Sequence, residues 1–397
     1  MLAASAQKFD AFTPSEEHHL LRQTVRGFVE REVEPQALEY ERDERFNADL
    51  FRSAAALGLF GITIPEAFGG AGLDATAAVI VAEEMSASDP GFAMSCLAHS
   101  ILFCHNLCIN GSDDQRTRYL EKTLSGEWIG GMCISEPDAG TDVLGMRSEA
   151  VLEGDRYRIN GRKMWITNGC VSDTELGDVF LVYAKVGGRV TTFVVEKGFP
   201  GFQLGQKIKD KTGMRTSPTA ELVFDDCQVP VENRLGDEGE SMIHMMRNLE
   251  IERLTLAAMS SGMARRAIDI MNRYATQRKA FGETINQFGQ IQRHIAESYA
   301  EYLAARSLIY DLAQRIELDR PGHRMQTDAA KLFAATMAKN VCDRAMQVLG
   351  GYGYVAESVV ERLWRAAKLI EIGGGTLEAH HKNITRDLAR HPDSLFA

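Results

Sequence analysis

A carboxylate stands where the sequence predicts a buried apolar side chain. Methionine and leucine recur every three or four residues at 242, 245, 249, 256, 259 and 263, and Glu252 completes the row. Burial of an unpaired carboxylate is costly, so Glu252 is either paired, for example with Arg253, or has a raised pKa. A carboxylate of the second kind is suited to abstract a proton, and the pattern alone leaves both interpretations open.

A glycine turn is the second chemical feature. Glycines 373–375 follow an amphipathic segment that ends in Ile372, and a new helix is predicted to begin near Thr376. Backbone without side chains lets a ligand approach closely and leaves N–H groups free, although a plain helix-ending loop has the same pattern. Glycines 350, 351 and 353 resemble a dinucleotide fingerprint, but they follow a helical pattern instead of a strand, which argues against a Rossmann site.

Two further stretches, CISEPDAGTD at 133–142 and KMWITNG at 163–169, combine hydroxyls, glycines and an aromatic ring. The first is typical of a turn with free backbone N–H groups, and the second offers a flat indole and a hydroxyl at a strand end. By composition each is only a loop. Together they predict a planar cofactor between a β domain and helices.

Other catalytic or metal-binding patterns are weak. His99, Cys104, His105 and Cys108 lie within ten residues, but their apolar surroundings favour helix packing, so no metal site is predicted. The phosphate-binding pattern GxxxxGK[ST] is absent, and no Ser–His–Asp order can be assigned. The pairs at 18–19 and 380–381 are expected to be surface or interface histidines, and the second pair lies close to the glycine turn.

The elements that must position these residues lie in three stretches of the chain that differ in their sequence patterns. Thr13, with Pro14 and Glu16, predicts a capping box that opens a first helix, and helical spacing recurs at 50–59, 76–87 and 92–107. Short β-rich runs follow at 157–160, 179–183, 192–195 and 221–224. No proline occurs between Pro230 and Pro321, so long helices are expected there. We predict an α+β protein with an α-helical domain at 1–128, a β domain at 129–235 and an α-helical domain at 236–397.

Composition excludes several classes of protein. The 397 residues are 45% hydrophobic and 25% charged, as in globular domains, and 44 Lys and Arg against 55 Asp and Glu give a net charge of −11. That charge argues against bulk binding of nucleic acid or of an anionic membrane surface. We find no unbroken apolar stretch of about 20 residues, no basic leader and only seven scattered cysteines, so we expect a soluble, unexported, cytoplasmic protein.

The motifs CISEPDAGTD, KMWITNG, EKGFPGF, KTGMR, RKAFG, QVLGGYGY and GGGT occur in the order of the acyl-CoA dehydrogenases. The chain resembles that family over nearly its whole length and is most similar to its isovaleryl-CoA branch. The resemblance implies three domains (α-helical, β, and a C-terminal four-helix bundle), FAD as cofactor, a homotetramer, an acyl-CoA substrate and electron-transferring flavoprotein as the electron acceptor.

The resemblance also implies roles for single positions. Those implied for FAD are Ile134, Ser135, Trp165 and Thr167 around the flavin ring, Thr141 near the pyrophosphate, Arg278, Phe281, Gln347 and Gly351 on the FAD of a neighbouring subunit, and Thr376 and Glu378 at the adenosine half. Those implied for the acyl-CoA are Ser135, Thr141, Arg253, Met94, Ala98 and Gly373. One position departs from the pattern, because Gly289 stands where the family has a glutamine that contacts adenine, and Gln290 follows it.

The sequence of the glycine turn departs further from the family pattern. Most of the family carries its catalytic glutamate in a Tyr-Glu-Gly-Thr motif, whose first two positions here are Gly373 and Gly374. The isovaleryl and long-chain branches instead place the base on a helix, in a segment that matches residues 249–254. The resemblance therefore selects Glu252 as the base, and it implies that the Gly374 N–H and the ribityl hydroxyl of FAD hold the thioester oxygen.

Loss of two side chains at 373 and 374 predicts extra volume beside the thioester. A branched short- or medium-chain acyl group, as in isovaleryl-CoA, is the expected substrate. The alternatives are a long straight chain, a terpenoid chain such as citronellyl, and, on the same fold, flavin-dependent monooxygenation or a catalytically silent CoA-binding scaffold.

Overall fold

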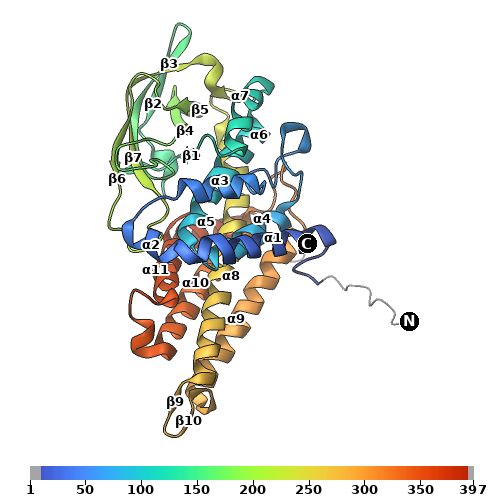
Figure 1. The fold of residues 1–397 in the computed structure, drawn as a ribbon. Helices are drawn as coiled ribbons and strands as arrows, with labels where there is room; N and C mark the ends of the chain where they lie inside the picture. Colours follow the sequence, from blue (N-terminus) through green and yellow to red (C-terminus); the bar gives the residue numbers. More distant parts are fainter. Residues whose placement is uncertain (1–9, 392–397) are drawn as a thin grey trace, which may run out of the picture.

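The computed structural model describes residues 10–391, and its first third is helical (Figure 1). The segments are α1 (Glu16–Phe28), η1 (Val29–Val33), α2 (Glu34–Asp43), α3 (Ala48–Ala56), η2 (Glu66–Phe68), α4 (Ala75–Ser86), α5 (Pro90–Leu97), η3 (Ala98–His105), α6 (Asn106–Asn110) and α7 (Asp113–Leu124).

The cap predicted for the first helix is wrong by two residues. α1 begins after Ser15, whose hydroxyl accepts the His18 N–H. Thr13 is held instead by Asp10, which accepts both its N–H (2.8 Å) and its hydroxyl (2.9 Å). Thr13 is therefore engaged in a turn before the helix, and Ser15 becomes the cap.

α5, η3 and α6 form one continuous helix with a π-helical middle. By length and composition Pro90–Asn110 is apolar enough to cross a membrane, the one such helix within residues 10–391, but 78% of its most apolar window is buried inside the protein. These are the surroundings of a core helix.

The middle of the chain forms an eight-stranded sheet in the order β6-β7-β3-β2-β4-β5-β8, with β1 parallel to β4. The strands are β1 (Gly130–Cys133), β2 (Glu149–Glu153), β3 (Arg156–Thr167), β4 (Val179–Val186), β5 (Arg189–Glu196), β6 (Phe202–Lys207), β7 (Thr219–Pro230) and β8 (Arg234–Leu235), with short 3-10 turns η4 (Val143–Gly145) and η5 (Val231–Asn233). The β3–β7 register shifts between Lys163 and Ile166, which makes a bulge at Trp165.

The last third consists of long helices. They are α8 (Ser241–Gln277), α9 (Gly289–Ala313), α10 (Arg324–Leu349), α11 (Val359–Ile372) and α12 (Leu377–Arg390), with the β9–β10 hairpin (Lys279–Ala280, Glu283–Thr284) and the turns η6 (Ile285–Gln287) and η7 (Gly350–Gly353). α8, α9, α10 and α11 pack together, and α8 also packs against α4. One hydrophobic core therefore joins the first and last thirds of the chain, while the sheet has a core of its own.

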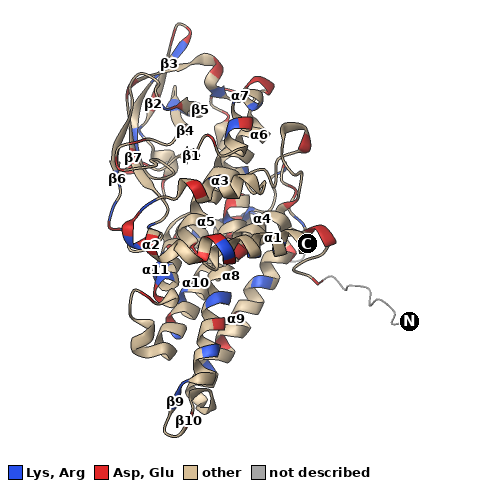
Figure 2. Cartoon of the chain, viewed as in Figure 1, with Lys and Arg blue, Asp and Glu red and all other residues tan. Residues whose placement is uncertain are grey.

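Charged side chains of both signs are interspersed over the helices and loops (Figure 2). A few are buried. Glu83 of α4 accepts hydrogen bonds from Arg22 of α1 (2.7 Å) and from Arg306 (2.8 Å) and Tyr310 (2.7 Å) of α9. Because each of these bonds joins two helices, the network ties the N-terminal helices to the C-terminal bundle.

Candidate active site

Glu252 lies against the glycine turn between α11 and α12. A Cβ built on Gly374 would lie 3.6 Å from Oε1 of Glu252. The side chain of Glu252 is 9% exposed, and its Oε2 is buried with no hydrogen-bond partner among residues 10–391. A helix and a turn that are far apart in the sequence thus bring the two residues singled out for proton chemistry into contact.

Gly374 has φ +63° and Gly375 has φ +91°, a left-handed turn that favours glycine. The Gly373 N–H closes α11 on Leu369 O (2.7 Å), whereas the Gly374 N–H donates to no group within residues 10–391. The turn therefore offers a free backbone donor next to a carboxylate. This is the arrangement needed to hold an oxygen on which negative charge develops.

The volume expected from the missing side chains is partly occupied. A Cβ on Gly374 would collide with Cδ1 of Leu256, which lies one helical turn after Glu252 on α8. The space that even an alanine methyl group would use therefore belongs to Leu256.

Burial raises the pKa of Glu252, while the charges of Arg253 and Lys331 act in the opposite direction. Arg253 does not pair with Glu252, because its Nη1 lies 3.1 Å from Oδ1 of Asp328 on α10. Of the two interpretations that the pattern left open, the structure therefore favours a carboxylate with a raised pKa over a paired one.

His380 is not a surface residue, contrary to expectation. It is fully buried, and its Nδ1 lies 2.7 Å from Oδ1 of Asp328, while burial lowers its pKa. A Cβ on Gly375 would lie 2.9 Å from Cε1 of His380, so the imidazole packs against the turn. His18, also expected at the surface, is buried between Ser15 and Asp74 (2.8 and 2.9 Å). Both ring nitrogens of His18 have a polar partner, whereas Nε2 of His380 has none within residues 10–391.

The CISEPDAGTD and KMWITNG stretches lie side by side. The Met164 N–H donates to Ser135 O (2.9 Å), and the ammonium group of buried Lys163 donates to Ile134 O (3.0 Å) and to Glu136 (2.8 Å). Glu136 also accepts the Arg147 and Ser148 N–H groups, and its pKa is lowered to about 2. A buried ion pair thus fixes this double loop.

The double loop presents a flat aromatic surface. Trp165 has φ +66° at the β3 bulge and remains 61% exposed, with Ile134, Ser135 and Thr167 buried or half-buried in the same region. An exposed indole held in a strained conformation within a well-packed sheet is what a planar ligand would cover, so these residues fit an isoalloxazine ring. Ile134 also packs in one cluster with Met245 and Leu249 of α8, which join this surface to the helix that carries Glu252.

The other positions implied for FAD lie elsewhere. Arg278, at the end of α8, and Phe281, 98% exposed in the β9–β10 hairpin, lie at the end of the molecule opposite the sheet (Figure 1). Gln347 and Gly351, at the end of α10, belong to the same tip, since the rings of Tyr274 and Tyr352 are 6.2 Å apart. Within one chain, the structure therefore does not bring these four residues to Trp165.

The remaining predicted positions are placed as follows. Thr376 caps α12 by accepting the Ala379 N–H (3.1 Å), Glu378 is exposed in the first turn, Thr141 is exposed in the double loop, Gly289 begins α9 with exposed Gln290 after it, Met94 is half-buried on α5, and Ala98 is buried at the start of η3.

One feature was not predicted from the sequence. Along the face of α8 that carries Glu252, buried polar atoms of Ser241, His244 and Asn248 have no hydrogen-bond partner within residues 10–391. Both amide atoms of Asn248, which is 3% exposed, are among them. The spacing 241, 244, 248, 252 is itself helical, so this polar row was visible in the sequence beside the apolar row that drew attention.

The His99 cluster packs as a core. The His99 Nε2 lies 2.8 Å from Thr123 O, and its Nδ1 accepts the Gly130 N–H (2.8 Å). Both ring nitrogens are thus used, and burial lowers the pKa of His99 to about 4. Within the described part of the chain, no group of three or more His, Cys, Asp or Glu side chains is arranged to hold a metal ion.

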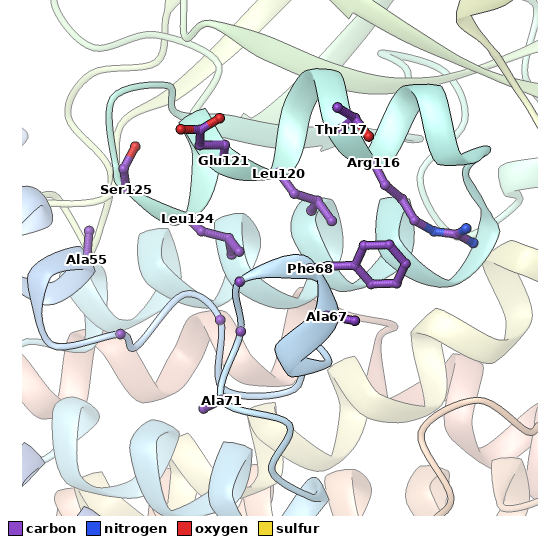
Figure 3. A pocket seen from close by; sticks show the side chains of 14 residues that line it. Ala55, Ala67, Phe68, Ala71, Arg116, Thr117, Leu120, Glu121, Leu124 and Ser125 are labelled. Carbon is purple, nitrogen blue, oxygen red and sulfur yellow. The ribbon is translucent and has the colours of Figure 1, made fainter.

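A cavity of about 590 Å³ opens on the outside of the helical domain (Figure 3). It lies between the loop that contains Phe68 and the helix α7, where the guanidinium of Arg116 stacks over the Phe68 ring with 5.2 Å between its Cζ and the ring centroid. Neither Glu252 nor the double loop lines it, so it is separate from the candidate active site.

The buried carboxylate beside a free backbone donor suits proton abstraction, and the exposed indole nearby suits a planar ring. Sequence profiles described as the N-terminal, middle and C-terminal domains of acyl-CoA dehydrogenase match residues 15–127, 131–227 and 242–389. The chain belongs to the acyl-CoA dehydrogenase family. It is therefore an FAD-binding enzyme that dehydrogenates acyl-CoA thioesters, with the fold expected from its motifs.

Three similar proteins illustrate the range of relatives. The mitochondrial isovaleryl-CoA dehydrogenase of Pongo abelii is 39% identical over 94% of this chain and 88% of its own length. The structure of butyryl-CoA dehydrogenase from Megasphaera elsdenii superposes with a TM-score of 0.90 at 31% identity, covering 98% of this chain and 100% of that one. An acyl-CoA dehydrogenase from Bacillus anthracis, solved as a complex with FAD, gives a TM-score of 0.88 at 31% identity, covering 95% of this chain and 67% of that one.

Proposed function

We propose that Glu252 is the base that removes the α proton of the acyl-CoA and that the Gly374 N–H holds the thioester oxygen. The observation that carries this assignment is the contact between the carboxylate and the turn, with Oε2 of Glu252 buried and unpartnered and the Gly374 N–H free. Of the three atoms nearest to a Cβ built on Gly374, one is Oε1 of Glu252 and the other two belong to Leu256.

The chemistry requires both groups. An α proton beside a thioester is too weakly acidic for a carboxylate in water, so the developing enolate oxygen must meet a fixed donor in a dry site. Burial of Glu252 raises its pKa and makes it a stronger base than a solvated carboxylate. FAD, when bound, supplies the acceptor for the β hydrogen, which leaves as hydride.

We further propose that Ile134, Ser135, Trp165 and Thr167 hold the flavin ring, with Thr141 at the pyrophosphate and Thr376 and Glu378 toward the adenosine. Arg278, Phe281, Gln347 and Gly351 gather at a distant, exposed tip. A second subunit would bring them to this cofactor, so the proposed assembly is a homotetramer.

The polar row on α8 is the proposed contact for the CoA arm. Acyl-CoA carries two amides in its pantetheine part, and buried Asn248 has an unpaired donor and an unpaired acceptor one turn from Glu252. Hydrogen bonds to the ligand would satisfy groups that are otherwise costly to bury. Arg253 is proposed to support the thioester site through Asp328.

For the acyl chain we propose a branched short- or medium-chain group, isovaleryl-like, bounded by Met94, Ala98 and Gly373. Support comes from the 39% identity to an isovaleryl-CoA dehydrogenase, whereas the space beside Gly374 is partly occupied by Leu256. Long-chain and terpenoid acyl-CoA are the competing substrates.

Three expectations from the resemblance or the composition are retained as proposals. The first is that electrons pass to electron-transferring flavoprotein. The second is that the domain limits are 1–128, 129–235 and 236–397. The third is that the protein is cytoplasmic, which is supported by seven free, buried cysteines.

The test is to mix the yellow protein anaerobically with isovaleryl-, isobutyryl-, butyryl-, octanoyl-, palmitoyl- and citronellyl-CoA and to follow the flavin absorbance. We expect the fastest bleaching with isovaleryl-CoA. A higher rate with palmitoyl- or citronellyl-CoA would replace the proposed substrate. Failure of every acyl-CoA to bleach the flavin, together with oxygen consumption supported by NADH and a flavin reductase, would favour monooxygenation.

A further inference from the structure

Lys331 of α10 is fully buried beneath the glycine turn. Its ammonium group donates a hydrogen bond to the carbonyl oxygen of Gly375 (2.6 Å). Complete burial of a lysine is rare and costs free energy, and here it lowers the pKa of Lys331 to about 8. At neutral pH the site therefore retains a buried cation that the flavin surface and the acyl pocket do not require.

The charges around Lys331 are unevenly paired. Oδ1 of Asp328 lies 3.1 Å from Arg253 and 2.7 Å from His380, whereas Oδ2 of Asp328 has no hydrogen-bond partner within residues 10–391. The one hydrogen bond of Lys331 is to a neutral carbonyl group, and the charged group that acts on it most strongly is Glu252.

Lys331 in turn affects Glu252. The positive charges that lower the pKa of Glu252 are those of Arg253 on its own helix and Lys331 on α10, and Tyr183 of β4 also faces it. Arg253, which also lies 3.1 Å from Asp328, has the larger influence on Glu252, and Lys331 is the cation that acts on Glu252 from another helix.

We propose that Lys331 is a positioning residue for proton abstraction: it fixes the glycine turn through the Gly375 carbonyl group and favours the ionised form of Glu252. The inference rests on the proposed role of Glu252 as the base. In that step the α C–H bond breaks, the proton moves to a carboxylate oxygen of Glu252, and the electron pair moves onto the thioester oxygen, which the Gly374 N–H binds. Lys331 acts before the step, since only ionised Glu252 accepts the proton.

Proton abstraction can be measured separately from oxidation. An acyl-CoA analogue with sulfur in place of the β carbon has α hydrogens but no β hydrogen to lose, so the holoenzyme in D₂O should exchange its α hydrogens without turnover. Mass spectrometry gives the exchange rate from about pH 5 to 9. For the wild type we expect a rate that rises with pH to a plateau, and its midpoint reports the ionisation of Glu252.

Lys331→Met removes the charge and the donor, and we expect the midpoint to move up by roughly one pH unit. Lys331→Gln removes the charge but keeps a donor, and should show the same shift even if Lys331→Met folds poorly. Lys331→Arg keeps the charge and should keep the wild-type midpoint. The matched control is Lys211→Met, because Lys211 is another lysine with a pKa lowered to about 8 by burial, bonded to Met214 O and Thr219 Oγ1 (both 2.8 Å). It should lose thermal stability without moving the midpoint.

An unchanged midpoint in Lys331→Gln would overturn the inference while leaving Glu252 as the base. An equal shift in Lys211→Met would also overturn it, because loss of any buried lysine would then suffice. Absence of exchange in the wild type at every pH would overturn the proposed function itself, and the inference with it.

Discussion

The carboxylate of Glu252 and the backbone of Gly374 are in contact: a Cβ on Gly374 would stand 3.6 Å from Oε1 of Glu252. By resemblance, most of the family carries its catalytic glutamate at position 374, whereas the proposed base here is Glu252 on α8. The two positions are neighbours in space, so a base on α8 can act beside a turn that contributes only its backbone N–H.

Glu252→Gln should abolish dehydrogenation and retain FAD. The amide has nearly the shape of the carboxylate but cannot take the α proton, so we expect flavin reduction to slow by at least about 10²-fold. Anaerobic rapid mixing with isovaleryl-CoA measures the rate, and the visible spectrum reports bound FAD. The matched variant is Glu250→Gln, since Glu250 is a buried neighbour that accepts the Gly322 and His323 N–H groups (3.1 and 2.9 Å). It should lower stability and keep the chemistry; equal loss of rate in both variants would contradict our assignment.

Gly374→Ala should be destabilising even though it is small. Its methyl group would collide with Leu256, and φ +63° is unfavourable for any residue with a Cβ. Overpacking and backbone strain together predict a loss of about 1–3 kcal/mol. In a Leu256→Ala background the collision disappears, so the cost of Gly374→Ala should fall to the strain alone, about 1 kcal/mol. A double-mutant cycle of unfolding free energies measures this coupling, and strict additivity would show that Leu256 does not limit the turn.

Much of the fold was predictable because it depends on local patterns. The strands at 179–183 and 192–195 and the helix at 76–87 appear within a few residues of their predicted limits. Thr376 caps α12, in agreement with the helix predicted to begin near it. The error at Thr13 has a local cause, because Asp10 holds the Thr13 N–H and hydroxyl in a turn while Ser15 accepts the His18 N–H as the cap.

The site was predictable only in part. Glu252 was visible because it interrupts an apolar row, whereas Lys331 and Asp328 lie in an ordinary helical sequence whose partners come from α8 and from the turn before α12. No spacing within α10 indicates that contact. His380 was expected at the surface or at an interface, and only the packing of α12 on α10 buries it.

Asn248→Leu should weaken substrate binding without weakening the fold. Within residues 10–391 neither amide atom of Asn248 has a partner, so an apolar replacement removes a cost in the free protein, and thermal stability should stay the same or rise. Loss of hydrogen bonds to the CoA arm should raise KM for isovaleryl-CoA about tenfold and leave kcat nearly unchanged. Asn233→Leu is the control, since its amide donates to Tyr119 Oη (2.9 Å) and Val194 O (2.7 Å), and this variant should lose stability. An unchanged KM in Asn248→Leu would remove the amide from the ligand site.

Buried neutral histidine should make the protein acid-sensitive in a defined range. The pKa of His99 falls from its ordinary value of 6.5 to about 4 because burial disfavours the charged ring, against the effect of its two backbone hydrogen bonds. A lowered pKa contributes stability that is complete above pH 6.5 and is lost as the pH falls toward 4, because the unfolded chain then binds a proton that the folded chain does not. At pH 5 the loss from this one group is about 2 kcal/mol.

His99→Gln keeps a donor for Thr123 O and an acceptor for the Gly130 N–H but does not titrate. Its unfolding free energy should therefore fall less between pH 7 and pH 5 than that of the wild type, by about the same 2 kcal/mol. Burial likewise lowers the pKa of His105 to about 4. In the double variant His99→Gln/His105→Gln we therefore expect a still smaller fall in unfolding free energy between pH 7 and pH 5. Urea unfolding at both pH values provides the comparison. If all three proteins show the same decrease, His99 and His105 take up protons in the folded state as readily as in the unfolded chain, and the acid sensitivity has another origin.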